Sequence, residues 1–271
     1  MGGNTMSKTS RPTHRLQPIF AVKRLCKELS PFRLHWFPRL RSTNDQAAAM
    51  RRRGELFAPA VVLTANQIAG RGRGAHSWWS QRGCLTVTFV AAAADNLKPH
   101  EIPLIAGLAV RQAAADITGR DDIRLKWPND LVHDGRKLAG LLCERLSRAD
   151  LIGVGLNVNL DRSGIPRDLR DRIACLSDLA GRELDMTNVL IRVAAAMHAQ
   201  LRRRAEHSFG AFVQDYRLYD DLRGKHITVL TDPATPLTGR CEGIDDSGRL
   251  LLRTDGGLQR VVAGHILSDR G

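Results

Sequence analysis

Residues 70–74 read Gly-Arg-Gly-Arg-Gly, which combines backbone freedom with two cationic side chains. Glycines let a backbone approach a ligand closely, and arginine carries forked donors that suit a carboxylate or a phosphate. With Ala75 the segment also has the spacing of a dinucleotide fingerprint, but that fingerprint must open a helix, and residues 76–80 lead on to another strand. The segment predicts a flexible cationic loop, with a solvated basic turn as the alternative.

A second group of polar residues surrounds a predicted hairpin. A strand expected over residues 123–127 ends at Pro-Asn-Asp, and the hairpin is expected over residues 131–142. Its turn is Asp134-Gly135, a dipeptide that suits the positive φ angles of a tight turn. Lys137 follows the turn and is therefore expected beside the end of the first strand.

Asn129 and Asp130 follow that strand and carry the other reactive groups. An amide can read a base edge or bind water, and a carboxylate can ligate magnesium or orient an amine. Both features also have an ordinary interpretation, because Asn-Asp forms turns and most single lysines lie at the surface. Neither group of residues identifies a reaction by itself.

Alternating helices and strands are expected to position these residues. Ser42 with Asp45, or Thr43 with Gln46, has the spacing of a helix N-cap. The apolar patterns predict strands at residues 60–64, 85–90 and 151–160 and helices at residues 102–117 and 190–205. One short helix, ending near Pro31, is expected within residues 16–34. Thr86 and Thr88 share one face of the second strand, and residues 65–82 are expected to form a long functional loop.

From residue 225 onward the sequence changes to short β-type runs, at residues 226–230, 237–244, 249–253 and 259–262. This pattern predicts a small all-β barrel appended to an α/β domain. At the other end, residues 1–15 are polar and are expected to be disordered, as a basic arm or, alternatively, a transit peptide.

Composition narrows the class of protein. The chain has 271 residues, with 41 Lys+Arg against 28 Asp+Glu, and a formal net charge of +13. No apolar run is long enough for a membrane span, and 43% hydrophobic residues exclude a wholly disordered chain. The arginine clusters at 51–53 and 202–204 are interpreted as solvated helix ends. Five scattered cysteines without a Cys-x-x-Cys pair favour free thiols over disulfides or zinc.

Five motifs then occur in a fixed order: Ser42-Thr43-Asn44; Gln67 with Ala69-Gly70-Arg71-Gly72-Arg73; Lys126-Trp127-Pro128-Asn129-Asp130; Arg136-Lys137-Leu138-Ala139-Gly140; and Gly153-Val154-Gly155-Leu156-Asn157-Val158-Asn159. Together they resemble the biotin protein ligases, also called biotin–[acetyl-CoA-carboxylase] ligases. The resemblance runs from about residue 36 to the end of the chain. It implies a mixed β-sheet with flanking helices, followed by an SH3-like C-terminal domain. The implied organisation is a basic extension at 1–35, a catalytic domain at 36–222 and the SH3-like domain at 223–271.

The resemblance implies a two-step reaction in which biotin and ATP form biotinyl-5′-AMP, and a lysine of a biotin carboxyl carrier protein then takes the biotinyl group. The residues implied to contact biotin are Ser42, Thr43, Asn44, Gln67, Arg71, Gly72, Arg73 and Lys137. Those implied to bind the nucleotide are Gly70, Arg71, Gly72, Arg73, Trp78, Asn129 and Asn157. Lys137, Arg73 and Asp130 are the expected catalytic residues, with Asp130 also the expected ligand of Mg²⁺.

Two alternatives and two departures from the family pattern remain. A lipoate ligase of the same superfamily is the first alternative, and a nucleic-acid-binding repressor, suggested by the net charge, is the second. Only about 35 residues precede the resemblance, whereas a winged helix-turn-helix needs roughly 60. A monofunctional cytoplasmic ligase without specific DNA binding is therefore expected, and whether it forms a homodimer is left open. Gly74-Ala75-His76 stands where the family's loop often carries another Arg-Gly pair, so loop closure or dimer coupling is expected to differ.

Overall fold

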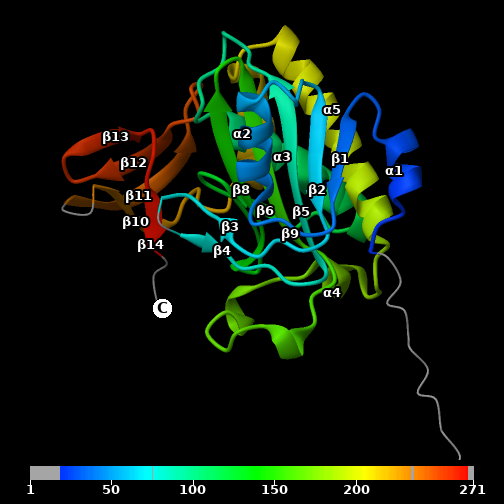
Figure 1. Cartoon of the computed structure of the whole chain (residues 1–271). Helices are drawn as coiled ribbons and strands as arrows, with labels where there is room; N and C mark the ends of the chain where they lie inside the picture. The colour runs from blue at the N-terminus through cyan, green and yellow to red at the C-terminus, as the bar shows by residue number, and fades with distance from the viewer. Residues whose placement is uncertain (1–18, 75, 233–234, 268–271) are drawn as a thin grey trace, which may run out of the picture.

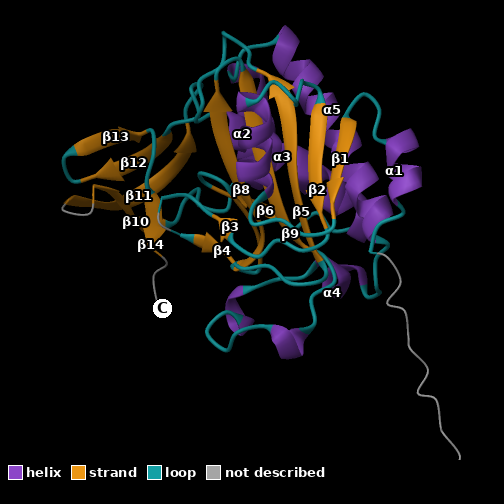
Figure 2. Ribbon diagram, viewed as in Figure 1, coloured by secondary structure: helices purple, strands orange, loops and turns teal. Residues whose placement is uncertain are grey.

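Two sheets form the framework of the protein in the computed structural model, which describes residues 19–74, 76–232 and 235–267. The larger is a seven-stranded sheet in the order β1-β2-β5-β9-β8-β7-β6, and the smaller is a five-stranded sheet in the order β13-β12-β11-β10-β14. In Figures 1 and 2 the smaller sheet lies to one side of the larger, whose two faces are covered by helices. Only the pair β1–β2 is parallel, which makes the large sheet mixed, as expected.

The strands are β1 Arg33–Phe37, β2 Ala60–Thr64, β3 Gly70–Arg71, β4 Ser77–Trp78, β5 Cys84–Ala92, β6 Arg124–Lys126, β7 Asp130–His133, β8 Arg136–Leu146, β9 Ala149–Asn157, β10 His226–Asp232, β11 Thr235–Ile244, β12 Leu250–Thr254, β13 Gly257–Val261 and β14 His265–Leu267. The helices are α1 Val22–Glu28, α2 Thr43–Arg52, α3 Ile102–Thr118, α4 Leu176–Ala180, α5 Met186–Glu206 and α6 Gly210–Tyr219. Two 3₁₀ turns, Arg162–Gly164 and Arg170–Arg172, lie between β9 and α4.

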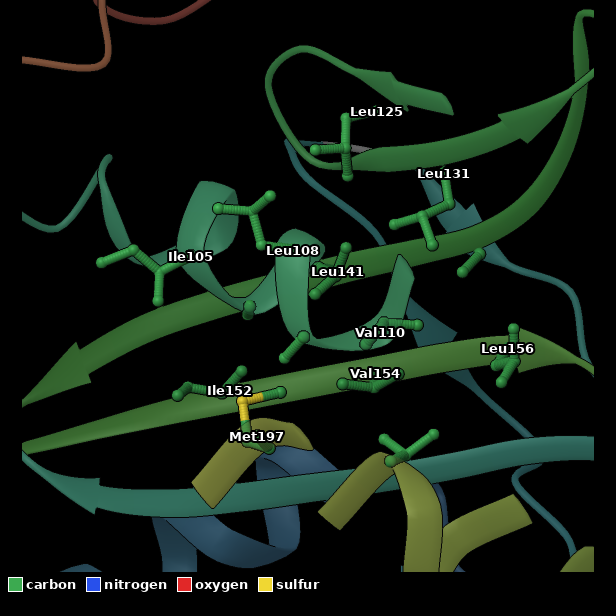
Figure 3. Packing of buried hydrophobic residues seen from close by; sticks show 14 of the residues in the cluster. Ile105, Leu108, Val110, Leu125, Leu131, Leu141, Ile152, Val154, Leu156 and Met197 are labelled. Carbon is green, nitrogen blue, oxygen red and sulfur yellow. The ribbon is translucent and has the colours of Figure 1, made fainter. Parts of the chain in front are cut away.

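The alternation of side chains along β2 explains the layers. Val61 and Leu63 belong to the main core under α3 and α5, whereas Ala60 and Val62 pack with α2 on the opposite face. Figure 3 shows the main core, where Leu108 of α3 packs above the strands that carry Leu141 and Ile152. The two-residue period thus gives the sheet two buried faces, and the polar Thr86 and Thr88 of β5 are buried as well.

The described part of the N-terminal segment packs with the seven-stranded sheet. Phe20, Leu25 and Leu29 are buried in the main core, and β1 pairs in parallel with β2. The boundary expected between residues 35 and 36 therefore falls within β1, a strand that the sequence patterns did not predict. The expected disorder of residues 1–15 lies outside the described residues.

The C-terminal domain is joined to the domain of the seven-stranded sheet by polar contacts as well as by the chain. The buried Trp127 indole donates its Nε1–H to the Gly248 carbonyl at 3.2 Å, and His100 Nε2 lies 2.8 Å from the Ser247 carbonyl. Both contacts use the turn between β11 and β12. The antiparallel five-stranded sheet agrees with the predicted small β domain, although its three-residue strand β14 was missed.

Several local predictions need correction. Arg204 was interpreted as part of a solvated helix end, but it is 4% exposed and pairs with the fully buried Asp150 at 3.0 Å. The loop expected over residues 65–82 contains the two-stranded ribbon β3–β4, because a short antiparallel pair forms between Gly70–Arg71 and Ser77–Trp78. The strand expected to reach residue 160 ends at Asn157, where pairing with β5 stops, and α6 was not predicted.

The junction between the domains contains a buried carboxylate, Asp220, that gives a testable pH effect. Its Oδ1 accepts a hydrogen bond from the Leu222 amide at 2.9 Å, while Oδ2 is buried without a hydrogen-bond partner among the described residues. Burial, reinforced by the nearby Asp221 charge, raises the pKa of Asp220 to about 6. The backbone amides of Leu222 and Arg223 and the charge of Arg223 act in the opposite direction.

Asp220→Asn is expected to stabilise the protein by about 2–3 kcal/mol at pH 8 and by little at pH 4. Because the folded-state pKa lies above the unfolded one, the cost of ionising Asp220 is absent in acid and grows as the pH rises through about 6. Urea unfolding at a series of pH values measures this, with Asp255→Asn in an exposed turn as the control. A stability gain that does not change with pH would contradict the assignment.

Candidate functional site

One large cavity, of about 960 Å³, opens between the large sheet, the β3–β4 ribbon and the edge of the C-terminal domain. Of the predicted site residues, Ser42, Thr43, Asn44, Gln67, Arg71, Gly72, Arg73, Trp78, Asn129, Asp130, Lys137 and Asn157 line it. Gly70 does not line the cavity but pairs with Trp78 in the ribbon behind it. Five motifs spread over more than a hundred residues therefore meet in one place.

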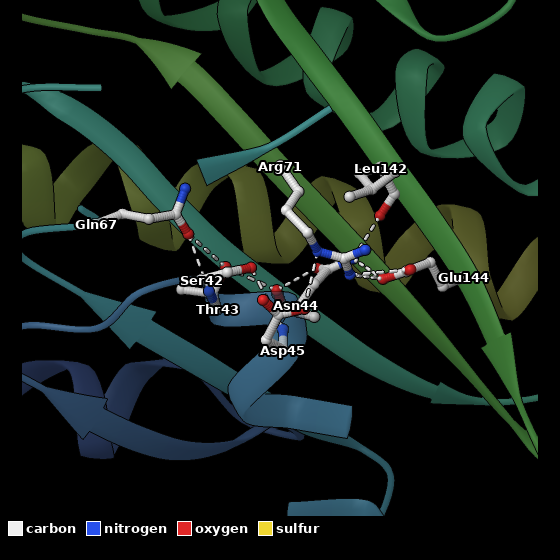
Figure 4. Close-up of polar contacts among 9 residues, drawn as sticks. Ser42, Thr43, Asn44, Asp45, Gln67, Arg71, Leu142 and Glu144 are labelled. Atoms are coloured by element: carbon white, nitrogen blue, oxygen red, sulfur yellow. Dashed lines mark hydrogen bonds and ion pairs between the residues drawn. The ribbon is translucent and has the colours of Figure 1, made fainter. Parts of the chain in front are cut away.

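The N-terminus of α2 supplies a buried polar group at one end of the cavity (Figure 4). Ser42 caps the helix by accepting a hydrogen bond from the Asp45 amide at 3.3 Å, which selects the first of the two predicted caps. The Thr43 amide donates to Gln67 Oε1 at 2.9 Å. Thr88 of β5 donates to Asn44 Oδ1 at 2.6 Å, so the helix end is held to the sheet by hydroxyl and amide groups.

Arg71 is held between two carboxylates. Its Nε lies 2.8 Å from Asp45 Oδ1, and its Nη2 lies 2.8 Å from Glu144 Oε2. Figure 4 draws Arg71 between these two side chains. Glu144 also accepts a hydrogen bond from Asn44 Nδ2 at 2.8 Å. Burial lowers the pKa of Arg71, but the hydrogen bonds and charges of Glu144 and Asp45 outweigh it and raise the pKa overall. Arg71 therefore connects the ribbon to α2 and β8.

Lys137 reaches the cavity because of a β-bulge. Leu131 of β7 lies opposite Ala139 and Val132 lies opposite Lys137, so Leu138 is an extra, fully buried residue. The bulge leaves Lys137 among the cavity residues, where its Nζ lies 2.7 Å from Asp130 Oδ1. The turn before it has positive φ angles at Asp134 and Gly135, as the dipeptide predicts.

The two amide side chains of the predicted nucleotide side are already bound to the backbone. Asn129 Nδ2 donates to the Leu141 carbonyl at 2.8 Å, and the Leu141 amide donates back to the Asn129 carbonyl at 2.9 Å. Asn157 Nδ2 donates to the Lys137 carbonyl at 3.1 Å. Both residues line the cavity, and both also fix the strand that carries Lys137.

Trp78 and two glycines form the floor of the cavity. The indole ring lies against Gly155 so closely that a β-carbon there would overlap it, and a β-carbon at Gly140 would lie 3.1 Å from the same ring. Lys137 Nζ lies 5.6 Å from the ring centroid, within the range of a cation–π contact. Trp78 Nε1 is buried without a hydrogen-bond partner among the described residues, so a donor is available at this point.

Arg73 extends from the ribbon toward the C-terminal domain. Its Nη1 donates to the Gly264 carbonyl at 3.2 Å, and burial lowers its pKa despite the opposing charge of Asp130. Gly264, His265 and Ile266 line the same cavity. The C-terminal domain is thus part of the cavity wall, which the motifs alone did not indicate.

Sequence reasoning missed the residues that hold the site together. Glu144 and Asp45, which bind Arg71, are ordinary charged residues in sequence, and no local spacing links them to residue 71. Thr88 was placed on one face of its strand, and that alternation was the available signal that it points toward α2. Among the described residues, no group of three or more His, Cys, Asp or Glu side chains is arranged to hold a metal ion.

The arrangement suits a ligand with two ends. Buried hydroxyls and amides at α2 can read a polar ring, while Lys137, Arg73 and Lys126 surround the part of the cavity beside the C-terminal domain and suit anions. Fixed cations between two anionic groups lower the repulsion that opposes a reaction between them. The chemistry best served is therefore the joining of a carboxylate to a phosphate.

Family models match both parts of the chain. Residues 36–161 match the Biotin/lipoate A/B protein ligase family, and residues 223–267 match the Biotin protein ligase C terminal domain. Among the described residues, no helix combines the length and apolar character needed to cross a membrane.

Named relatives and solved structures are similar over most of the chain. The bifunctional ligase/repressor BirA of Bacillus subtilis is 31% identical over 76% of this chain, which spans 65% of that relative's length. The biotin–[acetyl-CoA-carboxylase] ligase of Mycobacterium tuberculosis is 29% identical over 83% of this chain and 85% of its own. The Aquifex aeolicus biotin protein ligase, solved with biotin and ATP, superposes with a TM-score of 0.77 at 27% identity, covering 86% of this chain and 97% of that one.

Proposed function

Because the chain belongs to the biotin protein ligase family, we propose that it activates biotin with ATP and transfers the biotinyl group to a lysine of a carrier protein. The observation that carries this proposal is the single cavity in which a buried polar end and a cationic end meet around Lys137. The Aquifex aeolicus ligase was solved with biotin and ATP, which supports the same pair of substrates here.

Biotin fits the end of the cavity formed by α2 and β9. Its ureido group needs both donors and acceptors, which the buried Ser42, Thr43 and Asn44 carry. Its apolar ring and tail suit the cavity beside the Trp78 indole, which rests directly on Gly155. This places the carboxylate toward Lys137, at the boundary with the cationic end.

ATP then occupies the side of the cavity between the ribbon and the C-terminal domain. The biotin carboxylate attacks the α-phosphorus, the bond to the β,γ-pyrophosphate breaks, and biotinyl-5′-AMP and pyrophosphate form. Lys137 and Arg73 stabilise the negative charge that builds up between the two anions. Since water would hydrolyse the mixed anhydride, a closed ribbon protects it.

In the second step the amine of a carrier lysine attacks the acyl carbon, an amide bond forms and AMP leaves. The attacking amine must lose a proton, and Asp130 is the group we assign to hold it. Its carboxylate faces the cavity and lies 2.7 Å from Lys137 Nζ, so the lysine also fixes its orientation. The acceptor is a biotin carboxyl carrier domain, in line with the name of the Mycobacterium tuberculosis relative.

Mg²⁺ would enter with ATP rather than sit in a protein cage. Asp130 fits this ion beside the Lys137 end of the cavity, because Mg²⁺ is usually held by one or two carboxylates together with substrate phosphates and waters. Asp130 is the carboxylate we assign to it, and the bound ion would neutralise phosphate charge. The five free thiols are consistent with a reducing, cytoplasmic setting.

Exchange of labelled pyrophosphate into ATP tests the first step without a carrier. We expect exchange that requires biotin, and none when lipoate replaces it, because the polar end of the cavity suits a ureido ring. Exchange with lipoate alone would keep the mechanism and assign the chain to the other branch of the matched family. Exchange with neither acid would refute the proposal.

The close contact between Gly155 and Trp78 gives a specific prediction for the biotin site. Gly155→Ala is expected to raise the KM for biotin by about tenfold to a hundredfold, because the added methyl displaces the indole. Tryptophan fluorescence should shift in the same variant. Gly256→Ala, in an open turn, is the control, and an unchanged KM in Gly155→Ala would place biotin elsewhere.

Repressor activity is not part of this proposal. The name of the Bacillus subtilis relative includes that activity, but the chain spans only 65% of its length. In the described residues, the segment before the family match forms α1 and the first part of β1, which pack on the core of the large sheet. The net charge of +13 is expected to give only sequence-indifferent DNA binding that disappears at physiological salt.

A further inference from the structure

The glycine–arginine turn contacts the C-terminal domain at two adjacent residues. The imidazole rings of His76 and His265 are stacked, with centroids 5.0 Å apart and planes 25° apart. Beside them, Arg73 Nη1 donates to the carbonyl of Gly264 at 3.2 Å. In Figure 1 the β3–β4 ribbon lies next to β14, in agreement with these contacts.

The turn that makes these contacts is closed on itself. The Gly72 amide donates to the His76 carbonyl at 2.8 Å, and the His76 amide donates to the Arg73 carbonyl at 3.2 Å. His76 is followed directly by β4, which pairs with β3. Both ends of one tight turn are therefore attached to the C-terminal domain, one through a guanidinium and the other through a ring.

The opposite side of the contact is equally well fixed. His265 begins β14 and lies opposite Leu230 of β10 in an antiparallel pair. A β-carbon at Gly264 would lie 2.6 Å from Val229 Cγ1, so only glycine packs there without displacement. The sheet thus presents the Gly264 carbonyl and the His265 ring in set positions.

We infer that His265 is a positioning residue that holds the glycine–arginine turn, and with it Arg73 and Trp78, over the cavity through its stack with His76. Trp78 lies two residues beyond His76, on the floor formed by Gly155, so a shift of the turn moves the indole as well. This inference rests on the proposed function for its kinetic consequences but not for its structural ones. It assigns the C-terminal domain a part in closing the site.

The charges around the stack give it a pH dependence. His265 faces His76, Lys126, Arg73 and Asp130, and burial together with the first three lowers its pKa, against the effect of Asp130. The lowered pKa keeps the His265 ring neutral in the stack at pH 8. Protonation of His265 in acid costs free energy beside Lys126 and Arg73, so the turn is expected to loosen as the pH falls.

Limited trypsin digestion of the free protein tests the contact without reference to any activity. Cleavage after Arg71 and Arg73, located by mass spectrometry at pH 8, is expected to be about threefold to tenfold faster in His265→Ala, the factor that one aromatic pair supplies. His265→Phe keeps a ring and should restore the wild-type cleavage rate at pH 8. Cleavage of the wild type is expected to speed up at pH 6, whereas cleavage of His265→Phe is not, because phenylalanine does not titrate. His226→Ala, an exposed histidine of the same domain, is the control. Wild-type cleavage in His265→Ala would overturn the inference.

Kinetics separate positioning from general destabilisation. His265→Ala is expected to raise the KM for ATP by about threefold to tenfold with a smaller change in kcat, and His265→Phe should reverse this. A fall in kcat alone, unrescued by phenylalanine, would contradict the assignment. If His265→Ala does not fold, His76→Ala and His76→Phe test the same stack from the catalytic domain. A protein inactive toward biotin but with the expected cleavage pattern would refute the proposed function and retain the contact.

Discussion

Replacing Lys137 by alanine is expected to slow biotinyl-5′-AMP formation by about two to three orders of magnitude. One cation 4 Å from an anion gains about 4 kcal/mol at an effective dielectric constant near 20, which corresponds to nearly three decades in rate. Lys137 can supply this charge because the bulge at Leu138 directs it into the cavity and Asn157 holds its backbone carbonyl. The measurement is a single-turnover reaction with excess enzyme, biotin and ATP.

A second variant and a control make this result specific. Lys137→Met keeps most of the apolar stem and removes the charge, so it should be as slow as the alanine variant. Lys98→Ala removes an exposed lysine outside the cavity and should react at the wild-type rate. An unaltered single-turnover rate in Lys137→Ala would remove this residue from the mechanism.

Arg73→Ala is expected to release biotinyl-5′-AMP into solution about ten to a hundred times faster than the wild type. Arg73 joins the turn to the Gly264 carbonyl, and a hydrogen bond that involves a charged group contributes roughly 1.5–3 kcal/mol. Without it the ribbon opens more often and the mixed anhydride escapes. The escaped adenylate then reacts with any accessible lysine, so biotin should appear on an unrelated bystander protein.

Bystander labelling is measured by intact mass of a protein that lacks a carrier sequence, incubated with each variant. Arg240→Ala, on the C-terminal sheet away from the cavity, is the control for a lost surface charge. Tight retention of the adenylate by Arg73→Ala would show that other contacts close the site. Bystander labelling by Arg73→Ala and by His265→Ala is then compared. The comparison separates the effect of the Arg73–Gly264 hydrogen bond from that of the His76–His265 stack.

Strongly patterned segments could be predicted from the sequence because burial decides their structure. The run at residues 60–64 is apolar and fully buried, and β2 has those bounds. The helix predicted over residues 102–117 matches α3, which ends one residue later, at Thr118. Gly119 follows it in the left-handed conformation. The Asp134-Gly135 turn formed as expected, because its positive φ angles favour this dipeptide.

The segments that were missed have weak local signals. β1 is half buried at the edge of the sheet, so arginine and histidine interrupt its apolar pattern. β14 has three residues and forms only because β10 offers a partner. The buried Arg204 pairs with Asp150, which lies 54 residues away in the sequence. The residues next to Arg204 in the sequence therefore give no indication of this pairing.

The site shows the same division. Its motifs were identified by residue type and order, and nearly all of them line the cavity. The partners that orient them, Glu144 for Arg71 and His265 for the turn, come from elements far along the chain. Such contacts depend on how elements distant in the sequence pack together, which local spacing does not encode.

Intact-mass spectrometry of a biotin carrier domain, incubated with this protein, ATP, Mg²⁺ and biotin, tests the central claim most directly. Lipoate replaces biotin in a parallel reaction, and ATP is omitted from a third. We predict one ATP-dependent biotinyl addition, located by fragmentation at a single carrier lysine, and no lipoyl addition. An unmodified carrier in every reaction, with a folded enzyme, would contradict the account.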